Sequence, residues 1–85
     1  MLTNEEKYIF TSELALAISN GLQIDEGLKM LAGFDTRVSQ VAKRILDIMQ
    51  NDVSFIEALK NTSEFDEYMI QMVIVGQNIG NIDVV

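Results

Sequence analysis

The strongest constraint on the fold is the absence of proline from all 85 residues, combined with helix-ending residues that recur at short intervals. Proline is the residue least compatible with a helix interior, so its absence favours helices. Glycine, asparagine and aspartate supply the signals at which these helices can end. No low-complexity segment and no serine-glycine linker separates two parts of the chain. The sequence therefore predicts a single domain over residues 1–85, built as a run of short helices.

The first predicted helix runs from about Asn4 to Ser19. Thr3 and Glu6 have the spacing of a capping box, in which each side chain accepts a hydrogen bond from the backbone N–H of the other residue. Asn20 and Gly21 then tolerate a left-handed backbone, which ends a helix at little steric cost. Helical spacing predicts that the following residues face inward: Ile9, Phe10, Leu14, Ala17 and Ile18.

Two helices are predicted in the middle of the chain. A short helix from Asp25 to Ala32, closed by Gly33, turns Leu28 and Leu31 inward. The next helix has the clearest apolar period, and it ends at Asn51 and Asp52, which tolerate left-handed geometry better than most residues. Its inward face consists of Val38, Val41, Ala42, Ile45 and Met49.

Ser54 and Glu57 repeat the capping-box spacing and open a short helix through Lys60. The segment 61–64 is predicted to be a loop, with Ser63 as the N-cap of the following helix.

An apolar run from Phe65 to Val75 follows this loop. Periodicity alone does not separate a buried helix from a buried strand in such a run. We predict a helix, because a lone strand would have no partner here. Gly76 and Gly80 then bracket a turn, after which Asn81 begins another helix.

Acidic side chains outnumber basic ones by 13 to 6, which gives a net charge of −7. This charge repels the phosphates of nucleic acids and of anionic lipids, so we expect no nucleic-acid partner and a basic electrostatic partner if there is one. Residues 12–31 have the order of a helix-turn-helix, but Asp25 and Glu26 stand where such a motif would face DNA. Solubility alone would also explain the charge.

The residue types exclude most catalytic chemistry. The chain has no histidine and no cysteine, so it cannot form zinc sites or the usual nucleophile triads. Glu64, Asp66 and Glu67 could hold calcium or magnesium, but they lack the spacing of an EF-hand, and a solvated loop and helix start is the favoured interpretation. We therefore expect no catalytic residue, no cofactor and no metal.

We also expect this segment itself to be soluble. No stretch approaches the roughly 20 apolar residues that span a bilayer. The first residues lack the basic region and apolar core of a secretion signal.

Three groups of residues, in order along the chain, carry a resemblance to a known family. The first is Phe10, Leu14-Ala15 and Gly21-Leu22; the second is Asp52, Ser54, Phe55, Glu57, Ala58 and Leu59; the third is Gly76 and Gly80. Together they resemble the cytoplasmic domain of the F-family inner-membrane platform proteins of type II secretion systems and type IV pili. Four positions depart from the family pattern: Asp52 replaces a glycine, Phe55 a leucine, Gln77 a glutamate and Ile82 a leucine.

The resemblance implies an antiparallel bundle of six helices, of which five and the start of the sixth are present, so the chain would be truncated at its C-terminus. It implies a scaffold on the cytoplasmic face of the bacterial inner membrane, with membrane-spanning helices outside this chain. The partners would be the secretion or pilus ATPase and other platform proteins, and no covalent chemistry would occur.

Two alternatives remain open at this point. A free-standing small acidic helical adaptor or regulator would share the same helix-ending residues, and an enzyme would be restricted to carboxylate or magnesium chemistry on residues 64–67. If the last helix is missing, the apolar face around Ile70, Met72 and Val73 would be uncovered, which predicts a homodimer.

Overall fold

A computed structural model describes residues 2–71. In this part no strand occurs, and residues 67–71 are helical where the description ends. The predicted all-α bundle is therefore confirmed, while the predicted helix start at Asn81 lies outside the described residues. The helices are α1 (Asn4–Ser19), α2 (Ile24–Ala32), α3 (Arg37–Met49) and α4 (Phe55–Thr62).

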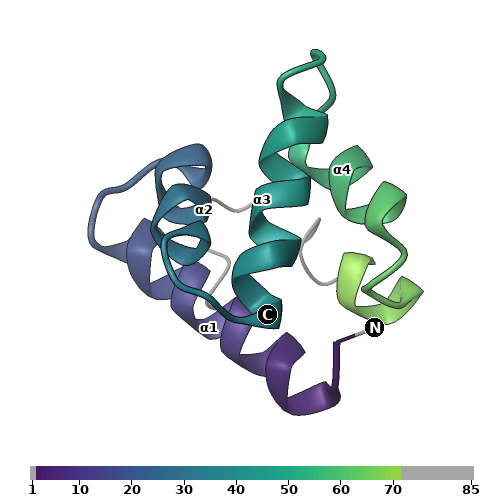
Figure 1. The fold of residues 1–85 in the computed structure, drawn as a ribbon, viewed down its shortest axis with the longest axis horizontal. Helices are drawn as coiled ribbons and strands as arrows, with labels where there is room; N and C mark the ends of the chain where they lie inside the picture. The colour runs from purple at the N-terminus through teal and green to yellow at the C-terminus, as the bar shows by residue number, and fades with distance from the viewer. Residues whose placement is uncertain (1, 72–85) are drawn as a thin grey trace.

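Helix α3 lies at the centre and packs against α1, α2 and α4 (Figure 1). This position follows from its apolar face, since residues three and four apart share one side of a helix. The predicted inward residues of α3 are buried, apart from Met49, which is partly buried. The neighbouring helices contribute Leu14, Leu28 and Leu59 to the same core.

Close packing of α1 on α2 depends on a glycine in α2. A Cβ atom on Gly27 would lie 2.8 Å from Cδ1 of Leu14 and 3.4 Å from Cβ of Ala17. A Cβ atom at this position would therefore require the buried Leu14 side chain to shift. The turn between these helices also needs a glycine, since Gly21 has a φ of +94°.

The segment after α4 returns to α1. The rings of Phe10 and Phe65 lie 5.0 Å apart between centroids, at an interplanar angle of 48°. Ile70 belongs to the same core and is only 4% exposed. The prediction that Ile70 lies on an uncovered face is therefore wrong, because the short helical turn at 67–71 directs this side chain inward. Met72 and Val73 lie outside the described residues.

The predicted inward face of α1 needs one correction. Ile9 is 41% exposed, whereas Ala15, which was not predicted, is buried. One residue of a helix corresponds to a rotation of about 100°. Because Phe10 points directly into the core, its neighbour Ile9 is rotated to the edge of the buried face.

The helix starts follow the capping predictions only in part. Thr3 and Glu6 form the complete capping box, with bonds of 2.8 and 3.1 Å. Ser54 accepts the N–H of Glu57 at 3.2 Å, but the Glu57 carboxylate lies 3.7 Å from Lys60 instead of returning to Ser54. The second capping box is thus half formed.

The residue that begins the helical turn at 67–71 also differs from the prediction. Ser63 ends α4 in the left-handed conformation, with a φ of +57°. Asp66 accepts the N–H of Met69 at 2.8 Å and so caps the next turn. The prediction of Ser63 as N-cap is wrong, because an N-cap residue has an extended backbone whereas Ser63 is left-handed.

Candidate functional site

The residues singled out from the sequence do not meet at one place. Phe10 and Leu14 are buried between helices, Gly21 lies in the α1–α2 turn, and Ser54 with Glu57 begins α4. Their positions indicate structural roles, in which these residues pack between helices or lie at helix ends. Gly76 and Gly80 lie outside the described residues.

The carboxylates at 64–67 each contact a different structural partner. The Glu64 carboxylate accepts bonds from Leu2 and Arg44, Asp66 caps a helical turn, and Glu67 accepts a bond from the Gln71 amide at 3.2 Å. Within residues 2–71 there is no group of three or more acidic, histidine or cysteine side chains arranged to hold a metal ion.

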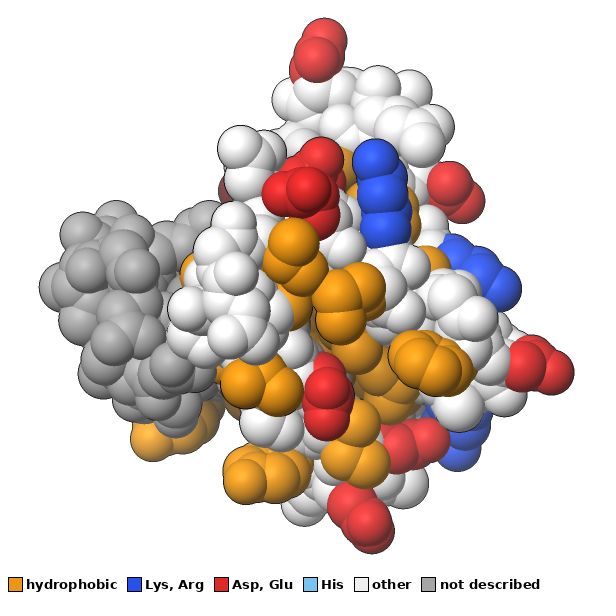
Figure 2. All heavy atoms as spheres, turned by 90° about the vertical axis from the view of Figure 1, so that its left-hand side faces the viewer, with side chains coloured by type: hydrophobic (Ala, Val, Ile, Leu, Met, Phe, Trp, Pro, Cys, Tyr) orange, Lys and Arg blue, Asp and Glu red, His pale blue; other side chains and the backbone are white. Residues whose placement is uncertain are grey.

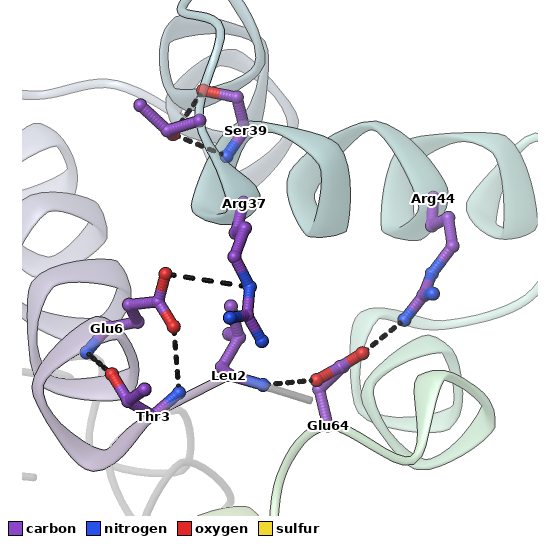
Figure 3. Close-up of polar contacts among 8 residues, drawn as sticks. Leu2, Thr3, Glu6, Arg37, Ser39, Arg44 and Glu64 are labelled. Atoms are coloured by element: carbon purple, nitrogen blue, oxygen red, sulfur yellow. Dashed lines mark hydrogen bonds and ion pairs between the residues drawn. The ribbon is translucent and has the colours of Figure 1, made fainter.

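Glu64 connects three segments that are far apart in the sequence (Figure 3). Its Oε1 accepts the backbone N–H of Leu2 at 2.6 Å, and its Oε2 accepts a hydrogen bond from Nη2 of Arg44, on α3, at 3.0 Å. Arg44 also donates to the carbonyl oxygen of Thr62 at 3.2 Å. We call these contacts of Leu2, Arg44, Thr62 and Glu64 the Glu64 clasp.

The Glu64 clasp stabilises the charged form of its carboxylate. The Glu64 side chain is only 12% exposed, and this burial acts to raise its pKa. The hydrogen bonds from Leu2 and Arg44 outweigh the burial, so the pKa of Glu64 lies below its ordinary value. This contact was not predicted from the sequence, because Leu2 and Glu64 are 62 positions apart.

A second carboxylate joins the start of α1 to the start of α3 (Figure 3). Glu6 accepts the backbone N–H of Thr3, and its Oε2 lies 3.7 Å from Nε of Arg37. The bond from the Thr3 backbone is the main cause that lowers the pKa of Glu6, and the hydroxyl of Thr3 and the charge of Arg37 add to it. The capping box was predicted from the sequence, whereas the ion pair to Arg37 was not.

An apolar groove lies between α1 and the α2–α3 turn, with a volume of about 470 Å³. Two of its residues are unusually exposed for their size: Phe34 at 67% and Ile9 at 41%. Figure 2 shows hydrophobic side chains gathered on the side of the molecule that carries α2, with acidic side chains among them. The full lining of this Ile9–Phe34 groove is Glu6, Ile9, Glu13, Leu31, Phe34, Thr36, Val38 and Ser39.

The fold and these contacts define a small all-α domain, in which carboxylates join distant segments and an apolar groove lies beside α1. None of the helices within residues 2–71 is long and apolar enough to cross a membrane.

A family model described as type II secretion system (T2SS), protein F, matches residues 10–85. Since this match covers most of the chain, the protein belongs to that family, and the resemblance predicted from the sequence is confirmed. Proteins of this family are inner-membrane platform components of secretion or pilus systems, with a structural role. No curated protein and no solved structure matches the chain.

Proposed function

We propose that the chain is the cytoplasmic domain of an inner-membrane platform protein for type II secretion or type IV pilus assembly. It scaffolds contacts with the assembly ATPase and with other platform subunits, and it carries out no covalent chemistry. The observation that carries this proposal is the family match over residues 10–85.

The proposal treats residues 1–85 as one domain, attached to the membrane by segments outside this chain. Two contacts of the first residues support this extent. Leu2 is buried in the core, and its backbone N–H bonds to Glu64. The first residues therefore pack with the matched region, although the family match begins only at residue 10.

Subcellular fractionation of the native source separates this proposal from the adaptor alternative. An antibody raised against the chain should detect a band several times heavier than 9.5 kDa that stays with the inner membrane until detergent is added. A free band near 9.5 kDa in the cytosol would refute the proposal and favour the free-standing acidic adaptor.

The partner assignment needs its own measurement. Chemical cross-linking in intact cells, followed by capture with the same antibody, should recover the assembly ATPase together with platform subunits. A membrane-bound band that cross-links to neither would keep the platform assignment and reject the scaffolding role.

Self-association of the domain stays a prediction. The burial of Ile70 removes one of the residues on which it was based. Sedimentation velocity of the purified chain over a range of concentrations tests it, and a monomer at every concentration would reject it.

A further inference from the structure

The Ile9–Phe34 groove presents large apolar side chains that the fold does not use. Phe34 follows the end of α2, and its ring is two-thirds exposed, while Leu31 and Val38 form the buried part of the lining. Exposed aromatic side chains beside a buried apolar floor are typical of anchor points in protein interfaces. The groove is therefore a surface suited to receive apolar side chains from a partner.

The charge around the groove is acidic. Glu6 and Glu13 line it, and Asp35 directly follows Phe34. Arg37 lies against Glu6, but Glu13 has no ion-pair partner within residues 2–71. Both charged side chains that line the groove are thus carboxylates, and one of them is paired with Arg37. A second copy of this chain would bring like charges together here, whereas a cationic partner would neutralise them.

The secondary structure of the partner follows from the hydrogen-bonding needs of its backbone. The described part of the domain contains helices only, so a bound segment finds no sheet edge to which it could add a strand. A helix satisfies its own backbone groups and can place apolar side chains three and four positions apart into one groove.

We propose that the Ile9–Phe34 groove binds a basic amphipathic helix of another protein, with its apolar side chains against Ile9 and Phe34 and a lysine or arginine beside Glu13. The groove and its charges carry this inference, which extends beyond the platform function and does not depend on it.

A display experiment tests this recognition chemistry directly. A phage library of helix-forming peptides is selected on the 85-residue chain and counter-selected on its Phe34→Ser variant. Enriched peptides should have a net positive charge and apolar residues at helical spacing. Enrichment of neutral or acidic peptides, or no enrichment over the counter-selection, would overturn the proposal.

Binding of an enriched peptide is then measured by fluorescence anisotropy. Phe34→Ser and Glu13→Lys should each weaken binding by about tenfold, and raising the salt from about 50 to about 500 mM should weaken it further. Tyr68→Ser is the matched control, since Tyr68 is 72% exposed and lies outside the groove. Circular dichroism checks that every variant folds.

Two results would refute the groove as the binding site. Equal loss of affinity in Phe34→Ser and in Tyr68→Ser would show nonspecific binding to exposed aromatic rings. A dimer of the wild-type chain that Phe34→Ser converts to a monomer in sedimentation would show that a second copy occupies the groove instead.

Discussion

Replacement of Glu64 by glutamine should destabilise the fold through the loss of one negative charge. Glutamine keeps a carbonyl oxygen that can accept the Leu2 N–H, but its NH₂ group then faces Arg44, which is also a donor. Hydrogen bonds to charged groups contribute about 1.5 to 3 kcal/mol, against about 1 kcal/mol for neutral ones. Arg44 is half exposed, which reduces the value of the ion pair.

We therefore expect Glu64→Gln to lower the free energy of unfolding by about 1 to 2 kcal/mol at neutral pH. For a domain of this size each kcal/mol corresponds to about 4 to 8 °C in Tm. Urea titration followed by circular dichroism gives the free energy, and a thermal scan gives the Tm. The matched control is Glu57→Gln, because the Glu57 carboxylate is well exposed and its pair with Lys60 is long; we expect a change below about 0.5 kcal/mol.

The stabilisation that Glu64→Gln removes should also depend on pH, and the direction of this dependence follows from the pKa of Glu64. The pKa of Glu64 is lower in the folded state than its ordinary value, so the unfolded chain binds the proton more readily. The stabilisation is then fully present above the ordinary glutamate pKa of about 4.3, and it is lost as the pH falls through the lower, folded-state pKa. The difference between wild type and Glu64→Gln should shrink over this acidic range.

Taking the difference between wild type and variant removes the contribution of Glu6, whose pKa is lowered in both proteins. A Glu64→Gln variant as stable as wild type at neutral pH would refute the assigned role of the Glu64 clasp. A stability difference that persists unchanged below the folded-state pKa would show that packing, and not charge, causes the loss.

Two backbone positions give further predictions. Gly21→Ala should lower the free energy of unfolding by about 1 to 2 kcal/mol, because the φ of +94° is unfavourable for alanine. A steric clash would not contribute, since a Cβ atom there would meet nothing within 4 Å. The control is Asn20→Ala, at a φ of −91°, which should lower the free energy of unfolding less in the same urea titration. Asp52→Gly should raise the free energy of unfolding by about 0.5 kcal/mol and Asp52→Ala should lower it by a similar amount, since Asp52 has a φ of +62°. An alanine variant at position 52 more stable than the glycine variant would contradict the backbone explanation.

Local signals predicted most of the fold because they act over a few residues. The bounds of α1 follow from the capping box at Thr3 and the turn at Gly21, and the period of α3 placed its buried face correctly. Asp52 takes the left-handed conformation at the place where the family pattern has a glycine. The caps and the left-handed turn depend on contacts within about one helical turn, and the apolar period of α3 is a pattern of residues three and four apart.

The local sequence did not predict the structure correctly where two nearby residues could both cap a helix or could both be buried. Ser63 and Asp66 are both good capping residues, and only the length of α4 decides that Ser63 ends one helix while Asp66 begins the next turn. Ile9 and Phe10 are both apolar, and packing against distant residues such as Phe65 accompanies the burial of Phe10. The same choice exposes Ile9 and so creates one wall of the groove.

The Glu64 clasp had no sequence signal for a different reason. Its donor at position 2 is a backbone N–H, which every residue except proline would supply. The side chains that determine the contact are therefore Glu64 and Arg44, both distant from the segment that they hold. A sequence pattern around Leu2 carries no information about this bond, whereas replacing Glu64 changes its acceptor and replacing Arg44 removes the side chain that holds this acceptor in place.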